Sequence, residues 1–191
     1  ERVALMFDIG EIHRARYGRL KRLLDVIVAL VGLALLVVIV VPVWVVNLVA
    51  NRGPLLYRQE RTGKGGRTFA ILKLRTMRPG DSQDWTAPDD PRVTPFGRLL
   101  RRTHVDELPQ VVNILRGELA LVGPRPEQPR YVAELTDKVP FYELRHLVRP
   151  GLTGWAQVKY DYGASDLDAL EKLQYEFFYL RHQSLTMDLR I

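Results

Sequence analysis

The pattern of hydrophobic and polar residues divides the chain into one long apolar segment and a mixed remainder. From Val26 to Val46 the sequence VIVALVGLALLVVIVVPVWVV contains no charged residue over 21 positions, which is long enough to cross the hydrocarbon core of a bilayer. The segment is too long for a signal peptide, and it lies too far from the first residue. The pattern therefore predicts a helix that enters a membrane.

Two features favour a helix that enters the membrane and returns to the same side. Pro42 removes a backbone hydrogen bond and is expected to break the helix. Basic residues also flank both ends of the segment, with Arg19 and Arg22 before it and Arg52 and Arg61 after it. A spanning helix would leave one of these basic flanks outside the cytoplasm, against the usual bias. We predict a re-entrant helix-break-helix over residues 17–52, and an ordinary transmembrane helix is the alternative.

The remaining chain alternates between short strand and helix patterns. Two strands, Leu55–Gln59 and Thr68–Arg75, flank a glycine-rich turn and predict a β-hairpin. Further on, the expected elements are a helix over Pro95–Arg102, a helix over Pro109–Leu115, a strand over Trp155–Val158 and a helix over Ser165–Arg181. The predicted fold is α+β and mainly helical, with the re-entrant segment, amphipathic interfacial helices and a small β-hairpin or sheet.

The expected organisation has three parts. Residues 1–16 form a lead-in from a larger protein, because the chain starts at Glu1 rather than at a methionine. Residues 17–52 form the membrane segment, and residues 53–191 form one catalytic domain on the cytosolic face. A length of 191 residues is ordinary for a single domain with a core of its own.

Charge and cysteine content narrow the function classes. Twenty-eight Lys and Arg against 22 Asp and Glu leave a net charge of +6, which favours nucleic acid, anionic lipid or phosphorylated substrates as partners. Nucleic acid is disfavoured because no groove-reading motif is present and no aromatics are interleaved in the basic stretches. The absence of cysteine excludes disulfides, thiolate zinc sites and cysteine catalysis.

The strongest candidate chemistry lies between Arg101 and Glu127. Asp106 and Glu107 are adjacent and precede a helix that begins at Pro109. Free N–H groups at such a helix start keep a carboxylate ionised, as nucleophilic attack or metal binding requires. The alternative is that both acids only complement the helix dipole.

Cations that suit phosphate binding lie on both sides of this acidic pair. Lys73 and Arg75 share one face of the second predicted strand, where two cations can converge on one phosphate. Arg125 stands between Pro124 and Pro126, and a guanidinium held in so rigid a turn suits bidentate phosphate binding. Each of these cations taken singly is also compatible with a solvated surface charge.

Two further polar residues, Asp25 and His104, are interpreted without a catalytic role. Asp25 follows Lys21 and Arg22 by four and three residues, and we predict that it pairs with one of them across a helix turn. His104 lies close to the acidic pair and is interpreted as incidental. The four histidines of the chain show no metal-ligand spacing.

Several long motifs in fixed order carry a family resemblance. RTHVDELPQVVNILRGELALVGPRPE is similar to the core signature of the bacterial sugar transferase family, the monotopic polyprenyl-phosphate phosphoglycosyl transferases that initiate glycan assembly on membranes. LKLRTM, DDPRVTPFGRLLRRT and VRPGLTGWAQV also match, and in the family's order. The resemblance runs from about Tyr17 to the last residue.

The resemblance implies an enzyme, a phosphoglycosyl transferase of exopolysaccharide biosynthesis. Asp106 would attack the β-phosphate of a UDP-sugar, release UMP and carry the sugar phosphate covalently to a polyprenyl (undecaprenyl) phosphate. Mg²⁺ would be held by Asp106 and Glu107, and Glu107 would share the metal or act as a base toward the acceptor. The residues expected to bind substrate phosphates are Lys73, Arg75, Arg101 and Arg125. Arg101 is included because it matches the arginine five positions before the family's acidic pair.

The resemblance also implies a location and leaves some properties open. It places the protein on lipid of the bacterial inner (cytoplasmic) membrane, with a monotopic helix whose break usually reads Ser-Pro. Here the break reads Val41-Pro42. The alternative function is a non-catalytic, membrane-anchored basic module that docks a partner or anionic lipid, which leaves the acidic pair unexplained. Neither the sugar nor the oligomeric state can be read from the sequence, so a homo-oligomer stays open.

Overall fold

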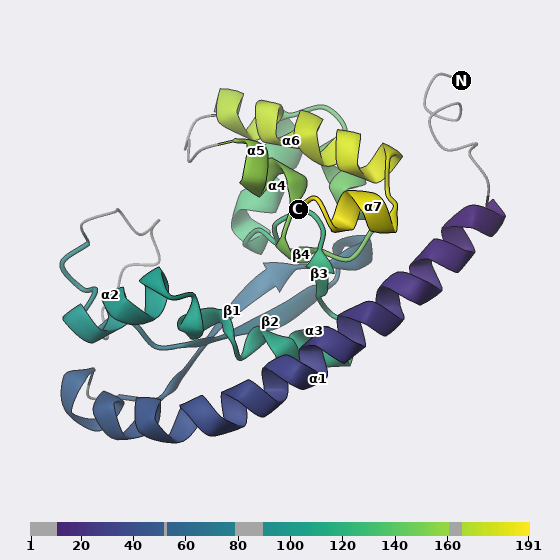
Figure 1. The fold of residues 1–191 in the computed structure, drawn as a ribbon. Helices are drawn as coiled ribbons and strands as arrows, with labels where there is room; N and C mark the ends of the chain where they lie inside the picture. Colours follow the sequence, from purple (N-terminus) through teal and green to yellow (C-terminus); the bar gives the residue numbers. More distant parts are fainter. Residues whose placement is uncertain (1–10, 52, 79–89, 161–165) are drawn as a thin grey trace.

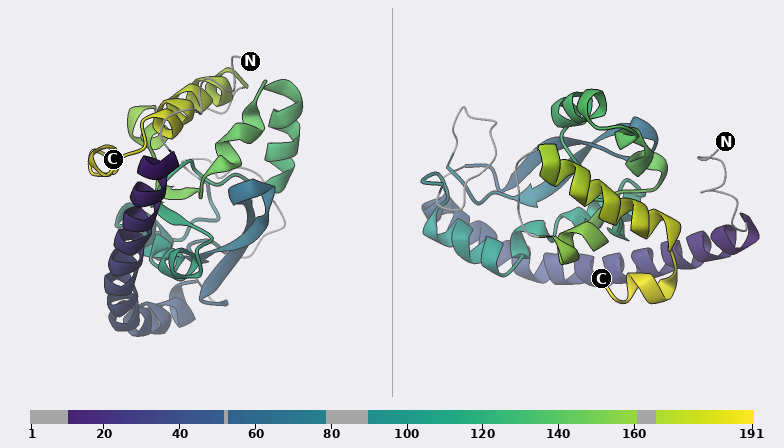
Figure 2. Two further views of the ribbon diagram at one scale, coloured as in Figure 1. Left: turned by 90° about the vertical axis from the view of Figure 1, so that its right-hand side faces the viewer. Right: turned by 90° about the horizontal axis from the view of Figure 1, so that it is seen from above.

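One long helix supports a small α+β domain along the whole of one side (Figure 1). The computed structural model describes residues 11–51, 53–78, 90–160 and 166–191. Helix α1 covers Glu11–Ala50, and the views in Figure 2 show the other elements gathered on one side of it. This arrangement confirms the predicted α+β, mainly helical fold.

Helix α1 is continuous through Pro42. It begins at Glu11, ahead of the expected start at residue 17, and it continues beyond the proline to Ala50. Figures 1 and 2 show a bend in its C-terminal part, which is where a proline inside a helix is expected to act. The expected interruption is therefore a bend within one helix, and the return of the chain to the same side of a membrane stays a prediction.

Two faces of α1 differ sharply in exposure. Toward the domain, Asp25, Ala29, Val43 and Asn47 are at most 7% exposed and recur at helical spacing. On the opposite face the exposed apolar residues include Leu23, Ile27, Val31, Val38, Val41, Trp44, Val45 and Val49. By length and composition the helix could cross a membrane. The protein thus presents an apolar surface of a size rarely left in water.

The predicted hairpin is confirmed. Strands β1 (Leu56–Thr62) and β2 (Thr68–Leu74) pair in antiparallel register through the short helix η2 (Lys64–Gly66). Gly65 has a φ of 68° inside this turn, a conformation that side chains with a Cβ rarely adopt. The turn chemistry therefore accounts for the register of the two strands.

Helix α2 (Pro95–Arg102) and helix α3 (Gln110–Arg116) form where helices were predicted, and the short helix η3 (Val105–Glu107) lies in the turn between them. The N-terminus of α2 is capped by Thr94, whose Oγ1 accepts a hydrogen bond of 2.9 Å from the N–H of Gly97. The C-terminus of α3 is closed by Gly117, which has a left-handed φ of 81°.

The second half of the domain is built on a parallel strand pair, β3 (Ala120–Val122) and β4 (Gly151–Thr153). The helices of this half are α4 (Pro129–Lys138), η4 (Tyr142–Leu147), α5 (Trp155–Lys159), α6 (Asp166–Arg181) and α7 (Leu185–Asp188). Ser165, the predicted start of the long helix α6, lies outside the described residues.

The strand predicted over Trp155–Val158 is wrong, because these residues form α5 and the strand lies just before it. A Cβ on Gly151 would lie 2.1 Å from the backbone nitrogen of Gly123, so only glycine permits this strand pairing. Gly154 is extended and serves as the N-cap of α5. The short apolar run was compatible with either element, and the glycine contact decided between them.

Helix α3 is fixed between α1 and the hairpin. On one side Val111 and Ile114 pack with Ala29 of α1 in the main hydrophobic cluster. On the other side the fully buried Asn113 accepts a hydrogen bond of 3.1 Å from the N–H of Leu72 and donates one of 2.8 Å to the carbonyl of Ala70. These bonds satisfy a backbone N–H and a backbone carbonyl on the edge of β2, and they hold α3 beside that strand.

The ion pair expected within α1 is replaced by contacts to the domain. Asp25 accepts a hydrogen bond of 3.1 Å from the N–H of Leu121, while Lys21 pairs with Asp188 at 2.8 Å. Arg22 donates to two carbonyls at the C-terminal end of α3, where the helix dipole favours a cation. The basic flank before the apolar segment therefore binds the domain to α1.

Replacing Gly97 with alanine is expected to destabilise the protein, because the new Cβ would lie 1.9 Å from the carbonyl oxygen of Thr76. We expect the free energy of unfolding to fall by about 1–3 kcal/mol through overpacking, measured by denaturation in lipid nanodiscs. Gly18→Ala is the matched control, since a Cβ on that helical glycine meets nothing within 4 Å. Equal stability of the two variants would contradict the close packing of α2 on Thr76.

Candidate active site

The two adjacent acids lie in the turn that joins α2 to α3. Pro109 has no N–H to donate, so the helix cannot run through this point and the backbone turns. His104 opens the turn with a φ of 55°, which is uncommon for a residue with a side chain. Asp106 is buried to 7% exposure and Glu107 is partly exposed. The turn thus presents two carboxylates together at the start of α3.

Lys73 of strand β2 reaches this acidic pair. Its Nζ lies 2.6 Å from Oε1 of Glu107, and both side chains are 22% exposed. Burial raises the pKa of Glu107, but the charge of Lys73 and its hydrogen bond outweigh burial and hold that pKa below its ordinary value. Glu107 is therefore an ionised carboxylate fixed in place by a cation.

Asp106 has a different electrostatic environment from its neighbour. Burial raises its pKa above the ordinary value for aspartate, while the cations Lys73 and Arg101 act in the opposite direction. A carboxylate with so little water around it interacts more strongly with a bound cation or phosphate group than a surface carboxylate does. The two acids are thus distinguishable, and Asp106 is the less solvated of the pair.

A pocket with an excess of positive charge adjoins the acids. Its lining includes the cations Lys73, Arg61 and Arg125, the acid Glu107, and the buried amide of Gln110. Burial lowers the pKa of Arg61, Glu127 raises it from 3.6 Å away, and the neighbouring charge of Arg125 lowers it. Three cations around one carboxylate form a site suited to a phosphorylated ligand.

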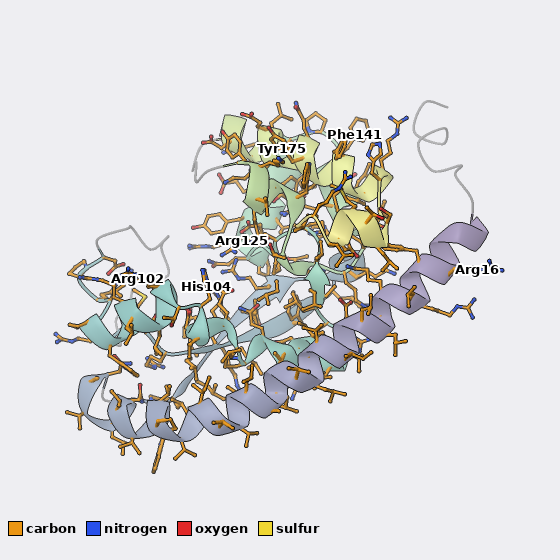
Figure 3. All side chains as sticks on the ribbon, viewed as in Figure 1. Arg16, Arg102, His104, Arg125, Phe141 and Tyr175 are labelled. Carbon is orange, nitrogen blue, oxygen red and sulfur yellow. The ribbon has the colours of Figure 1, made fainter. Side chains whose placement is uncertain are left out.

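Arg125 is presented to this pocket by a turn that is bonded on several sides. The carbonyl of its neighbour Pro126 accepts a hydrogen bond of 3.0 Å from Nη1 of Arg61, and the carbonyl of Glu127 accepts one of 2.8 Å from the N–H of Thr62. Figure 3 shows the Arg125 side chain on the side of the domain where His104 also lies, away from the outer face of α1. The predicted rigidity of the turn has a structural basis in these bonds.

The structure brings Arg101 toward the acids and directs Arg75 elsewhere. Nε of Arg101 donates a hydrogen bond of 2.9 Å to Oγ1 of Thr76, and its charge acts on Asp106. Arg75 lies one residue beyond the end of β2, and its Nε donates to the carbonyl of Pro54 at 3.0 Å. The side chains of Lys73 and Arg75 therefore do not converge. Lys73 bonds Glu107, whereas Arg75 bonds the connection between α1 and β1.

Two residues of the pocket were missed by sequence reasoning. Arg61 belongs by its position in the chain to the basic flank of the membrane segment, yet its side chain is only 15% exposed and lies in the pocket. Gln110 is 2% exposed and follows the acidic pair within DELPQ. Its position in that motif was a usable signal, whereas the inward orientation of Arg61 follows only from the packing of β1 on the Arg125 turn.

The donor set at the acids fits a hard cation that is shared with a substrate. Among the described residues there is no group of three or more acidic, histidine or cysteine side chains able to enclose a metal ion. Mg²⁺ commonly takes one or two carboxylates together with substrate phosphates and water, rather than an all-protein cage. Asp106 and Glu107 would supply those carboxylates, and the cationic pocket beside them suits the phosphates.

The exposed apolar face of α1 suits a membrane, and the acid pair beside a cationic pocket suits a phosphorylated ligand. The sequence profile of the bacterial sugar transferase family matches residues 16–191. The chain belongs to this family, and the family predicted from the sequence motifs is confirmed.

Individual relatives are identical to this chain at more than a third of the aligned positions. A UDP-N-acetylgalactosamine-undecaprenyl-phosphate N-acetylgalactosaminephosphotransferase of Aeromonas hydrophila is 38% identical over 178 residues, 92% of this chain and 42% of that protein. A UDP-glucose:undecaprenyl-phosphate glucose-1-phosphate transferase of Xanthomonas campestris pv. campestris is 39% identical over 177 residues, 90% of this chain and 37% of that protein. A transferase of the same name from Caulobacter vibrioides is 39% identical over 191 residues, 95% of this chain and 70% of that protein. The chain spans about two fifths of the length of the first two relatives.

Proposed function

We propose that this chain transfers a sugar-1-phosphate from a UDP-sugar to undecaprenyl phosphate and so starts the assembly of a membrane-bound glycan. The observation that carries the proposal is the buried Asp106 beside the Lys73–Glu107 pair, at the edge of a pocket lined by Arg61 and Arg125. The names of the relatives support both substrates. The match of this chain to 70% of the Caulobacter vibrioides transferase supports placing the activity in this domain.

The first half-reaction makes a covalent intermediate on Asp106. A carboxylate oxygen of Asp106 attacks the β-phosphorus of the UDP-sugar, and the bond from that phosphorus to the oxygen bridging the two phosphates breaks. UMP leaves with the bridging oxygen, and the sugar phosphate stays on the aspartate as an acyl phosphate. Arg125 and Arg101 are positioned to offset charge on the phosphates, because phosphoryl transfer depends mainly on positioning and charge stabilisation.

The second half-reaction regenerates the free carboxylate of Asp106. A phosphate oxygen of undecaprenyl phosphate attacks the same phosphorus, the bond to Asp106 breaks, and undecaprenyl diphosphate sugar is released. Glu107, held by Lys73 at 2.6 Å, would share the metal or act as a base toward the acceptor phosphate. Mg²⁺ bound by Asp106 and Glu107 would reduce the repulsion between these carboxylates and the substrate phosphates.

A metal-dependent release of UMP is the expected signature of this function. Purified protein in lipid nanodiscs, given Mg²⁺ and a panel of UDP-sugars, should release UMP from one or a few of them and form lipid-linked product when undecaprenyl phosphate is added. The panel also identifies the sugar, for which the relatives' names give both glucose and N-acetylgalactosamine. Membrane binding without UMP release from any donor would favour the non-catalytic membrane module instead.

The packing of α1 supports a monotopic placement in the inner membrane, with the domain on the cytoplasmic face. Domain residues contact α1 from Asp25 to Asn47, a stretch of about 33 Å at the rise of an α-helix. This is as long as the hydrocarbon core of a bilayer is thick. A spanning orientation would therefore bring β2, α3 and their polar groups into lipid, where unpaired polar groups are costly.

Cysteine labelling tests this placement, since the chain has no cysteine of its own. Single cysteines in Arg16→Cys and Arg52→Cys should both react with a membrane-impermeant maleimide only from the cytoplasmic side. Val38→Cys is the control for a lipid-facing position and should stay unlabelled in intact membranes. Labelling of position 52 from the outside would establish a spanning helix.

A further inference from the structure

A buried ion pair lies against the backbone of Arg125. Arg145 of η4 and Glu176 of α6 are 4% and 5% exposed, and two hydrogen bonds of 2.6 and 2.9 Å join them. The hydroxyl of Tyr142 also accepts a hydrogen bond from the guanidinium. Removing two charges from water costs free energy that their attraction often does no more than offset. Such a pair is therefore poorly explained by stability alone.

The ion pair contacts the backbone of Arg125. Nη2 of Arg145 donates a hydrogen bond of 2.8 Å to the carbonyl oxygen of Arg125. Burial raises the pKa of the Glu176 carboxylate, while Arg145 and the backbone N–H of Arg125 act to lower it. Because Pro124 and Pro126 lack an N–H, the N–H of Arg125 is the single amide donor of the Pro-Arg-Pro run. Arg145 thus bonds the carbonyl of Arg125, and Glu176 interacts electrostatically with the N–H of the same residue.

We propose that Arg145 and Glu176 are positioning residues, which act by holding the backbone of Arg125 so that its guanidinium meets the donor phosphate. The inference rests on the proposed function and extends it to residues that do not touch the substrate. A displacement of about 1 Å at a phosphate-binding group can reduce the rate on the order of 100-fold. Such a sensitivity gives a reason to hold Arg125 with buried charges rather than with a flexible loop.

The test uses a variant that removes both charges and keeps a packed interior. In Arg145→Met/Glu176→Leu no charge is left unpaired, and replacing a buried ion pair by apolar residues is often tolerated. Lys21→Met/Asp188→Leu is the matched control, because it removes another largely buried ion pair, one that joins α1 to α7. Thermal unfolding in nanodiscs identifies the temperature range in which all variants are folded, and the assays are run there.

A double-mutant cycle with Arg125→Ala separates positioning from general damage. With Arg125 present, the Arg145→Met/Glu176→Leu variant should lose about tenfold or more in kcat/KM. In the Arg125→Ala background no guanidinium is left to position, so the same pair of changes should cost less than about twofold. The control pair should give equal, small effects in both backgrounds. An equal loss with and without the Arg125 side chain would overturn the proposal.

Hydrogen exchange tests the same idea without any activity. Exchange of the Arg125 amide, followed by mass spectrometry of a peptide spanning residues 123–127, should accelerate in Arg145→Met/Glu176→Leu and stay unchanged in the control pair. Unchanged exchange would overturn the positioning role whether or not the protein transfers sugar phosphate. Accelerated exchange in a protein whose wild type releases no UMP would instead count against the proposed function alone.

Discussion

Replacing Asp106 with asparagine is expected to abolish formation of a phosphosugar adduct and the release of UMP. Asparagine is nearly isosteric with aspartate but is not an anionic nucleophile, so the first half-reaction loses its attacking group. The measurement is incubation with labelled UDP-sugar and Mg²⁺ in the absence of acceptor, followed by detection of label on the intact protein. The wild type should carry label at Asp106, and the variant should carry none.

Two companion variants sharpen this result. Asp137→Asn makes the same chemical change on an exposed residue of α4 and should leave adduct formation unaffected. Glu107→Gln should impair overall transfer severely but still form the adduct slowly, if Glu107 works mainly on the acceptor half-reaction. An adduct that persists in Asp106→Asn, or that maps to another residue in the wild type, would reject Asp106 as the nucleophile and leave family membership intact.

Arg125→Lys is expected to lower transfer activity by about 100-fold without loss of membrane association. Lysine keeps the positive charge but lacks the planar fork that bonds a phosphate through two N–H groups. The turn bonded by Arg61 presents the side chain at a fixed position in the pocket, so a shorter point charge cannot shift to compensate. Steady-state kinetics with the donor and flotation with lipid vesicles measure the two properties.

Arg67→Lys is the control for this variant, because it makes the same exchange at an exposed position of the hairpin. Its activity should equal that of the wild type. Near-normal activity of Arg125→Lys as well would show that the Arg125 side chain needs only its charge, or has a structural role. A loss of membrane association in Arg125→Lys would indicate that the turn supports the fold of the domain rather than the substrate.

Local backbone chemistry made much of the secondary structure predictable. Thr94 as a cap, Pro109 at a helix start and Gly117 at a helix end act within one turn of chain, so their effects do not depend on distant contacts. The glycines before Thr68 likewise set the hairpin. Where the local signal was weak, as for the apolar run after Gly154, the strand prediction was wrong because glycine-to-glycine packing placed the strand earlier.

The candidate site was partly predictable for a related reason. Asp106 was recognisable because it lies next to a helix start, and Arg125 was recognisable because prolines flank it on both sides. The pairing of Lys73 with Glu107 joins residues 34 positions apart and was not predicted as a contact. It depends on Asn113, which fixes α3 against the edge of β2.

The sequence by itself determined the family, the apolar segment, the ends of α2 and α3 and the identity of the acid pair, because each depends on local order along the chain. Only the tertiary structure decided which cations face the pocket. It turned Arg61 inward and Arg75 toward Pro54, although position alone assigns both to other roles. It also brought Arg145 and Glu176 together against the backbone of Arg125. The orientation of a long charged side chain depends on which elements pack beside it. The spacing of residues along the sequence does not reveal that packing.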